Sequence, residues 1–234
     1  MGLFWIFFMA APEAEPVSIA LKAGKVSGLI VAPKDARACY VMAHGAGAGM
    51  AHPFMASVAS GFAERGIATL RYQFPYMEAG GKRPDPPPVA HAAVRAAVEA
   101  ARRRFPKLPL FAGGKSFGGR MTSQAQATAP LENVHGLIFF GFPLHAAGKP
   151  SQERAAHLSD VTIPMLFLQG TRDALAELDQ LTPVCQALSR ATLKLFDDAD
   201  HSFHVPARTG RKDTEVMAQM LDTTAEWINL SPSP

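Results

Sequence analysis

The segment that most constrains the fold of this chain is residues 113–119, which read GGKSFGG. An apolar run over residues 108–112 precedes it, and a run compatible with a helix, residues 120–129, follows it. A G-x-S-x-G motif between a strand and a helix forces a turn so sharp that the serine backbone is strained and its neighbours must be small. The turn raises the serine hydroxyl above the edge of a sheet, where a base can reach it. The motif therefore predicts that Ser116 is a nucleophile in acyl transfer.

Two other interpretations of this segment are open. The letters GGKS also resemble the end of a phosphate-binding loop, G-x-x-x-x-G-K-S. That loop needs a glycine at position 109, where the chain has Pro109 inside the expected strand. A glycine-rich turn with an incidental serine is the second alternative, because short patterns of common residues also arise by chance. The remainder of the chain has to decide between the nucleophile turn, the phosphate-binding loop and an incidental serine.

Length and composition fit one folded domain with a sizeable core, which we expect over residues 17–230. The chain has 234 residues, of which 48% are hydrophobic and 18% are charged. The net charge of +3 is small, and its densest cluster, residues 102–104 (RRR), closes an expected helix, where cations suit the helix dipole. We therefore expect no nucleic-acid partner. Two cysteines, Cys39 and Cys185, are too few for a disulfide framework and are expected to be small apolar fillers.

Residues 1–16 stand apart as an N-terminal apolar segment. Its most apolar part, residues 3–9 (LFWIFFM), is far shorter than the roughly 20 residues of a membrane-spanning helix. No Lys or Arg precedes Lys22, so the basic region of a secretory signal is missing. We expect a cytoplasmic protein without a membrane span. Export is the alternative, because Ala10-Ala11 resembles a cleavage site.

Strand and helix patterns alternate along the chain. About eight strands are expected, at residues 17–21, 26–31, 38–43, 67–72, 108–112, 135–141, 165–169 and 192–196. Helices are expected at residues 53–65, 89–104, 117–129, 175–188 and 214–228. This alternation predicts an α/β fold, with a mostly parallel sheet that is opened by an antiparallel pair and covered by helices on both faces. The irregular stretches, 73–88 and 142–161, are too short for a large lid domain.

A serine hydroxyl becomes a good nucleophile only when a base removes its proton and an acid orients that base. With the serine in such a turn, the order along the chain is serine, acid, histidine, each after a strand. Asp173 follows the strand expected at 165–169, and His201 follows the strand expected at 192–196. We therefore expect Ser116, Asp173 and His201 to form a catalytic triad.

Each partner of the serine has an alternative. Glu177 or Asp179 could replace Asp173, which could instead cap the helix expected from residue 175. His204 could replace His201, but it lies three positions farther from the end of the strand. The position nearest the strand end favours His201.

Acyl transfer also needs fixed donors for the negative oxygen of the tetrahedral intermediate. One expected donor is the backbone N–H of Phe117, directly after the nucleophile. The second is expected in the turn after the third strand, residues 44–49 (HGAGAG), whose small side chains let an amide point inward. Ala46 is the preferred donor there and Gly47 is the alternative, whereas His44 is expected to hydrogen-bond the loop.

This glycine turn has two further interpretations. A dinucleotide fingerprint, G-x-G-x-x-G, would need a glycine at position 50, where the chain has Met50, and no acidic residue ends the next strand. A metal site would have to use His44, His52, His201 and His204, which lack a carboxylate or thiolate at a suitable spacing. We expect neither a metal nor a cofactor.

With these residues placed, the chain resembles the α/β-hydrolase superfamily over nearly its whole length. More narrowly, it is similar to a small dienelactone-hydrolase-like group that includes the testis-expressed and NSL complex subunit 3 hydrolase-like proteins. The segments that carry the resemblance are 44–47 (HGAG), 71–76 (RYQFPY), 114–120 (GKSFGGR), 141–144 (GFPL), 170–173 (GTRD) and 200–203 (DHSF). The resemblance implies the α/β-hydrolase fold. True dienelactone hydrolases use a cysteine as nucleophile, so Ser116 argues against lactone specificity.

These observations predict a serine hydrolase that cleaves a small-molecule ester or thioester, with the substrate and the oligomeric state left open. From loop position, an apolar acyl pocket is expected to be lined by Met50, Phe74, Met77, Met121 and Phe142. The alternative is a non-catalytic interaction protein on the same scaffold, since the resemblance includes interaction subunits. That alternative predicts a broken triad, or a site blocked by Lys115 or by the 73–88 loop.

Overall fold

A computed structural model describes residues 12–231 of the chain. All eight strands join one sheet in the order β1-β2-β4-β3-β5-β6-β7-β8. The strands are β1 (Glu15–Ala20), β2 (Lys25–Val31), β3 (Ala38–Ala43), β4 (Ile67–Tyr72), β5 (Leu110–Lys115), β6 (Val134–Phe140), β7 (Met165–Gly170) and β8 (Ala191–Phe196).

The sheet is parallel from β4 to β8, while β1 and β2 run antiparallel at one edge. Parallel neighbours need crossover connections, which the helices supply. The helices are α1 (Pro53–Ala63), α2 (Pro75–Glu78), α3 (Pro87–Arg104), α4 (Phe117–Thr128), α5 (Leu178–Ala187) and α6 (Asp213–Leu230), with short 3-10 helices η1 (Glu153–Asp160) and η2 (Ala207–Thr209). The predicted fold class, a mostly parallel sheet between helices, is confirmed.

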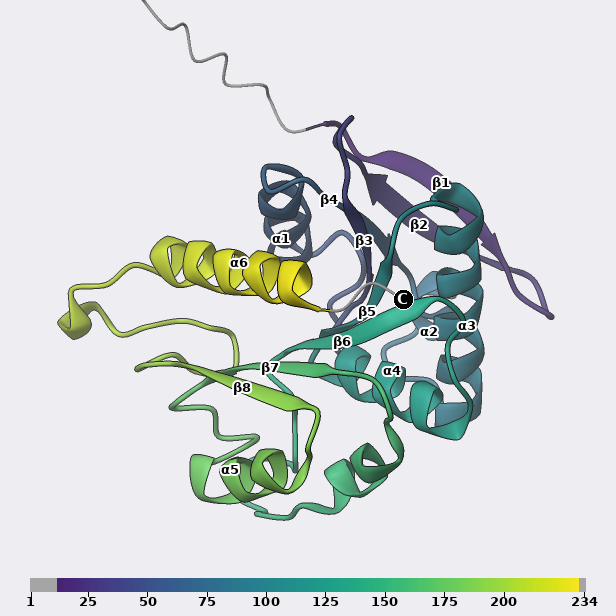
Figure 1. Ribbon diagram of the computed structural model, residues 1–234. Coiled ribbons are helices and arrows are strands. Elements are labelled where there is room, and N and C mark those ends of the chain that lie inside the picture. The colour runs from purple at the N-terminus through teal and green to yellow at the C-terminus, as the bar shows by residue number, and fades with distance from the viewer. Residues whose placement is uncertain (1–11, 232–234) are drawn as a thin grey trace, which may run out of the picture.

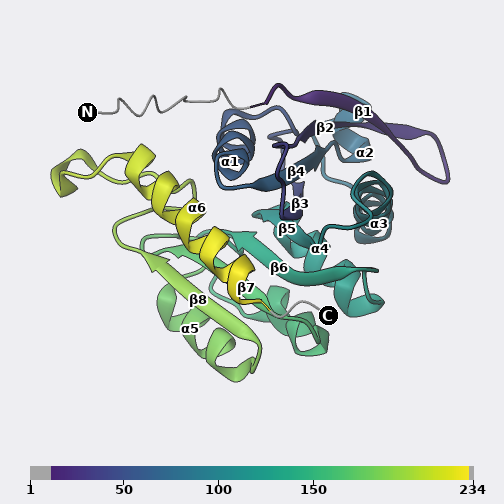
Figure 2. The same ribbon diagram turned by 45° about the horizontal axis from the view of Figure 1, so that its top comes forward.

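Helices cover both faces of the sheet (Figures 1 and 2). Helices α1 and α6 lie on one face, and α3, α4 and α5 lie on the other. The central strand β3 explains why both faces are apolar. Its side chains alternate between the two cores, with Val41 facing the α3 side and Tyr40 facing the α1 side. A continuous buried run is therefore what a central parallel strand requires.

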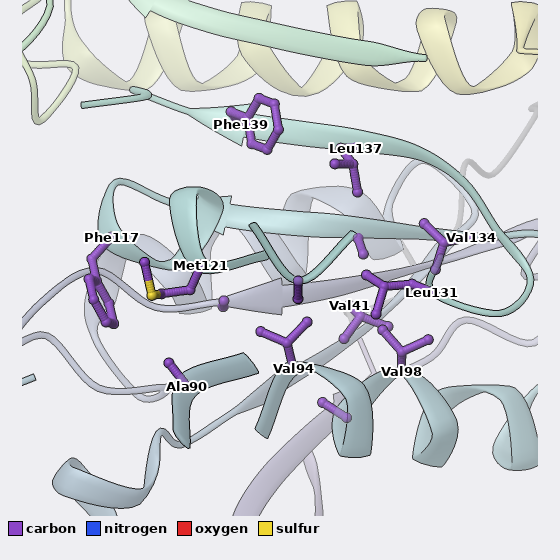
Figure 3. Packing of buried hydrophobic residues seen from close by; sticks show 14 of the residues in the cluster. Val41, Ala90, Val94, Val98, Phe117, Met121, Leu131, Val134, Leu137 and Phe139 are labelled. Carbon is purple, nitrogen blue, oxygen red and sulfur yellow. The ribbon is translucent and has the colours of Figure 1, made fainter. Parts of the chain in front are cut away.

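Packing on the α3 side follows the spacing of small and branched side chains (Figure 3). Ala90, Val94 and Val98 lie along one face of α3, and all three are buried against the sheet. Residues four apart in a helix share a face, so this stripe points to β3 and α4. Phe117 and Met121, one turn apart on α4, lie at the end of the same core nearest to the serine turn.

Two stretches expected to be irregular contain short helices. Helix α2 lies within residues 73–88 and η1 lies within residues 142–161. Helix α5 begins at Leu178 rather than at residue 175. The reason is a turn in which the Asp173 carboxylate accepts a hydrogen bond from the Leu175 backbone N–H, at 2.8 Å. Asp173 therefore closes this turn and does not cap the helix.

The arginine cluster at the end of α3 is engaged with carboxylates. Arg102 and Arg103 both contact Glu99, at 2.8 and 3.2 Å, and Arg104 contacts Glu15 at 3.1 Å.

Among residues 12–231, no helix combines the length and the apolar run needed to cross a bilayer. The apolar run 3–9 lies outside the described residues.

Candidate active site

The turn between β5 and α4 holds Ser116 in a strained backbone conformation. Its φ is 50° and its ψ is −116°, a combination that L-residues rarely adopt. Glycines flank it because β3 lies so close. A Cβ atom on Gly114 would lie 2.1 Å from the Ala43 carbonyl oxygen, and one on Gly118 would lie 2.5 Å from the same oxygen. The G-x-S-x-G spacing is thus the spacing at which this turn can pass over the neighbouring strand.

Ser116, His201 and Asp173 form one hydrogen-bonded chain. The Ser116 Oγ lies 2.8 Å from His201 Nε2, and His201 Nδ1 lies 2.6 Å from Asp173 Oδ2. The three residues follow the ends of β5, β8 and β7, which meet at one edge of the parallel sheet. A carboxylate on Nδ1 fixes the proton on that nitrogen and leaves Nε2 free to accept a proton from the serine.

The carboxylate of Asp173 is held by a buried framework. Its side chain has no exposed surface, whereas His201 keeps 24% of its side-chain surface exposed. Gln169 is fully buried beneath it and donates from Nε2 to Asp173 Oδ2. The Gln169 Oε1 atom in turn accepts the Phe142 backbone N–H at 3.0 Å. Gln169 was not singled out by sequence, because a glutamine at the end of a strand gives no distinctive pattern.

The alternative acids and base lie elsewhere. His204 pairs with Asp213 at 2.9 Å and keeps 61% of its side chain exposed. The Glu177 carboxylate contacts His145 Nε2 at 2.6 Å, and Asp179 lies in the first turn of α5. The geometry therefore brings His201 and Asp173 to Ser116, and not these three.

Two backbone N–H groups beside Ser116 lack protein acceptors. Within the described part of the chain, neither the Phe117 nor the Ala46 backbone N–H donates to a protein group. The Gly47 N–H is already used, since it donates to the Tyr76 hydroxyl oxygen at 2.8 Å. Ala46, Ser116 and Phe117 line one cleft together. This arrangement favours Ala46 over Gly47 as the second donor.

His44 stabilises the glycine turn as expected. It is buried, its Nδ1 lies 2.7 Å from the Gly45 carbonyl oxygen, and its Nε2 accepts the Phe74 backbone N–H at 3.1 Å. Burial lowers the pKa of His44, which favours the neutral ring that these two bonds require. Among residues 12–231, no group of three or more His, Cys, Asp or Glu side chains could hold a metal ion.

Lys115, directly before the serine, reaches the loop that carries His201. Its ammonium donates to the His201 backbone carbonyl and lies 5.3 Å from the centre of the Phe203 ring. Burial lowers the pKa of Lys115 to about 8. The side chain thus ties β5 to the loop that carries His201. It does not close the site.

Two clefts meet at the serine. One has a volume of about 370 Å³ and the other about 310 Å³, and both are lined by Ala46, Ser116 and Leu175. The larger cleft extends over α4 towards η1, and the smaller one extends towards α1 and His201. A group bound at Ser116 can therefore extend in two directions.

The expected acyl pocket needs correction. Of its five residues, Met121 lines the larger cleft. Phe74 and Phe142 are buried in the core instead, where Phe74 packs edge-on against Phe117 and Phe142 packs against Phe167. Met50 and Met77 line neither cleft. Loop position predicted Phe74 and Phe142 in the pocket, but both side chains are buried in the core.

Comparison with known proteins bears on the family and the fold. A family model described as an alpha/beta hydrolase domain matches residues 36–229. The fold is similar to that of a dienelactone hydrolase from Anabaena variabilis, with a TM-score of 0.76 and 20% identity over 95% of this chain and 100% of that one.

Two further solved structures share the fold. A serine hydrolase without a lid from Xanthomonas campestris has a TM-score of 0.72 and 22% identity, over 95% of this chain and 97% of that one. A cold-adapted esterase from an Arctic intertidal metagenomic library has a TM-score of 0.67 and 19% identity, over 91% and 93%. The strand order, the serine turn and the family match lead to one conclusion: the chain belongs to the alpha/beta hydrolase domain family.

Proposed function

We propose that this protein is a serine hydrolase that cleaves a carboxylic ester or thioester through an acyl-enzyme. The observation that carries the proposal is the position of His201, whose two ring nitrogens lie 2.8 Å from Ser116 Oγ and 2.6 Å from Asp173 Oδ2. A histidine held between a serine and a buried carboxylate is the arrangement that activates a serine for acyl transfer.

The reaction follows from the geometry. The Ser116 Oγ attacks the carbonyl carbon while His201 Nε2 takes the hydroxyl proton. The negative oxygen that forms accepts hydrogen bonds from the Phe117 and Ala46 backbone N–H groups. His201 then gives its proton to the leaving alcohol or thiol, and an acyl-enzyme remains on Ser116. A water molecule, deprotonated by His201, cleaves the acyl-enzyme and releases the acid.

Asp173 keeps His201 ready for both proton transfers. Its carboxylate accepts the Nδ1–H and stabilises the positive ring that forms when Nε2 takes a proton. Because Gln169 and the Leu175 backbone N–H also bind this carboxylate, its orientation is fixed before substrate arrives. Preorganised groups of this kind need no rearrangement during the reaction.

Relatives of known activity support the reaction class but not the substrate. The structural neighbours include a dienelactone hydrolase and an esterase, both at or below 20% identity. We also propose that the chain is related more narrowly to the testis-expressed and NSL complex subunit 3 hydrolase-like proteins. A purely non-catalytic scaffold would be expected to separate His201 from Ser116 or to obstruct the site. The 2.8 Å distance and the two clefts at Ser116 favour turnover.

A fluorescent fluorophosphonate tests the proposal directly, because it phosphonylates only an activated serine. The wild type should be labelled, and Ser116→Ala and His201→Ala should not. His204→Ala is the matched control and should be labelled like the wild type, since His204 pairs with Asp213 away from the site. If the folded wild type resists labelling and hydrolyses no 4-nitrophenyl ester or thioester, the proposed hydrolase activity is refuted.

A further inference from the structure

The larger cleft at Ser116 carries an unneutralised positive charge. Arg120 and Arg154 both line it, together with Ala46, Ser116 and Phe117. Within residues 12–231, no carboxylate oxygen lies within 4.0 Å of either guanidinium. Other arginines of the described residues also lack a carboxylate partner, but these two share the lining of one cleft with Ser116.

Arg120 has an incompletely bonded guanidinium beside the nucleophile. It lies one helical turn after the nucleophile, and its backbone N–H donates to the Ser116 carbonyl oxygen at 3.1 Å. Its guanidinium lies over the Phe117 ring, 5.9 Å from the ring centre. The Nε atom is buried and has no hydrogen-bond partner in the described part of the chain. A buried charged donor without an acceptor is unfavourable, so this group is suited to a ligand that brings one.

The charges of Arg120 and Arg154 act on each other and on a neighbouring histidine. Burial, and then the nearby Arg154, lower the pKa of Arg120. Burial, followed by Arg120 and His91, lowers the pKa of His157 to about 4. One acidic side chain, Asp85, also lines the cleft and accepts the Tyr76 backbone N–H at 3.0 Å, so two arginines and one carboxylate leave the lining with a net charge of +1. An anion placed beside Arg120 and Arg154 would offset the repulsion between these two guanidinium groups.

The smaller cleft has a different character. The apolar side chains that only this cleft has are Ala48, Phe54 and Met55, and its polar lining consists of His52, Lys115, Ser116, His201 and Ser202. The charged group there, Lys115, is already bonded to the His201 carbonyl. The reacting carbonyl would thus lie between the larger cleft, which is cationic, and the smaller cleft, which is mainly apolar.

We propose that the scissile ester or thioester joins an apolar group to a group that carries a carboxylate or phosphate. The anion binds Arg120 and Arg154 in the larger cleft, and the apolar group occupies the smaller cleft beyond Ser116. The inference rests on the proposed function, because it names the substrate class of that same site. Arginine suits this role, since its planar guanidinium binds oxyanions through paired hydrogen bonds.

The test compares neutral and anionic esters. The neutral ester is 4-nitrophenyl hexanoate. The anionic esters are 4-nitrophenyl hydrogen adipate, with the carboxylate on the acyl side, and 5-hexanoyloxy-2-nitrobenzoate, with the carboxylate on the leaving group. A phosphonate in place of the adipate carboxylate distinguishes phosphate from carboxylate preference. For each, kcat/KM is measured with the wild type, Arg120→Gln, Arg154→Gln and Arg208→Gln.

At least one anionic ester should be preferred, and each cleft variant should lower its kcat/KM about tenfold relative to the neutral ester. Arg208, exposed on η2, is the control, and its variant should change neither ester. Arg154 lies on a short surface helix, so its variant tests the idea even where Arg120→Gln disturbs α4. Arg120→Lys, which keeps the charge but not the paired bonds, should lie between the wild type and Arg120→Gln.

Failure of the inference and failure of the proposed function have different signatures. Fluorophosphonate labelling and hexanoate hydrolysis report the serine, and the ratio of anionic to neutral kcat/KM reports the arginines. An active enzyme whose ratio is unchanged in both arginine variants overturns the anion site and leaves the hydrolase standing. An unlabelled, inactive wild type overturns both.

Discussion

The backbone N–H of Gly47 donates to the Tyr76 hydroxyl oxygen at 2.8 Å, across 29 positions of the chain. This bond links the glycine turn after β3 to α2, a helix of only four residues. The Ala46 N–H, one residue earlier, is the proposed second donor to the oxyanion. The direction of that donor therefore depends on a phenol outside the turn.

Removing that phenol should impair catalysis more than binding or stability. Tyr76→Phe keeps the ring but leaves Gly47 without its acceptor, so the Ala46 N–H loses its fixed direction. We expect kcat to fall about tenfold, KM to change little, and the free energy of unfolding to fall by roughly 1 kcal/mol. Steady-state kinetics measure kcat and KM, and urea denaturation measures the free energy of unfolding. A kcat equal to that of the wild type would show that the turn holds its shape unaided.

The strained backbone of Ser116 predicts a stability gain on mutation. Its φ of 50° is a conformation that glycine adopts freely, and such strain is worth about 1–3 kcal/mol. Ser116→Gly should raise the free energy of unfolding by about 1 kcal/mol while abolishing activity. Ser116→Ala, which retains a Cβ atom and hence the strain, is the matched control and should stay near the wild type. Equal stability of the two variants would contradict the explanation.

Lys115 predicts a pH dependence of stability. Burial lowers its pKa from 10.5 to about 8. Between these pH values the unfolded chain holds a proton that the folded protein has released, so the free energy of unfolding rises with pH. Lys115→Met removes this contribution. From about pH 8 to pH 10, the wild type should gain on the order of 2 kcal/mol relative to the variant.

Urea denaturation at several pH values, with Lys149→Met as an exposed-lysine control, measures this difference. The control variant should follow the wild type throughout. Parallel curves for the wild type and Lys115→Met would mean that the ammonium titrates as it does in water.

The smaller, mainly apolar cleft predicts that kcat/KM depends on the length of the apolar chain of the ester. Ala48 is half-buried and lines the smaller cleft, so a larger side chain there would fill it. Ala48→Phe should lower kcat/KM for long-chain esters at least tenfold, while acetate esters retain most of their activity. Ala51→Phe, an exposed position that lines neither cleft, is the control. If long and short esters lost activity equally, the apolar group would have to lie elsewhere.

The parts that follow from local pattern were predictable from the sequence. Residues 38–43 are apolar without interruption because β3 is buried on both faces, and the observed strand has the expected bounds. The serine turn was predictable because its glycines are required by contact with one neighbouring strand. The order of serine, acid and histidine then indicated which loops to search, although it left alternatives in each loop.

The parts that depend on long-range packing were not predictable. Phe74 follows a strand, as a pocket residue does, yet it packs against His44 and Phe117 in the core. Arg120 belongs to a helical pattern, and nothing in that pattern reveals its orphaned Nε or the proximity of Arg154. Helix α2 has four residues, too few to show a period. Such features arise from contacts between segments that are far apart in the sequence.

The two clefts place reactivity and selectivity under separate control. The proposed proton-transfer groups follow β5, β7 and β8, whereas the walls of the clefts also draw on the glycine turn, α1, the segment before α3, α4 and η1. Replacing Arg154 or Ala48 alters a wall without touching Asp173 or His201. A lineage built on this scaffold can therefore acquire new substrates through a few surface substitutions, while its reactive core is inherited unchanged.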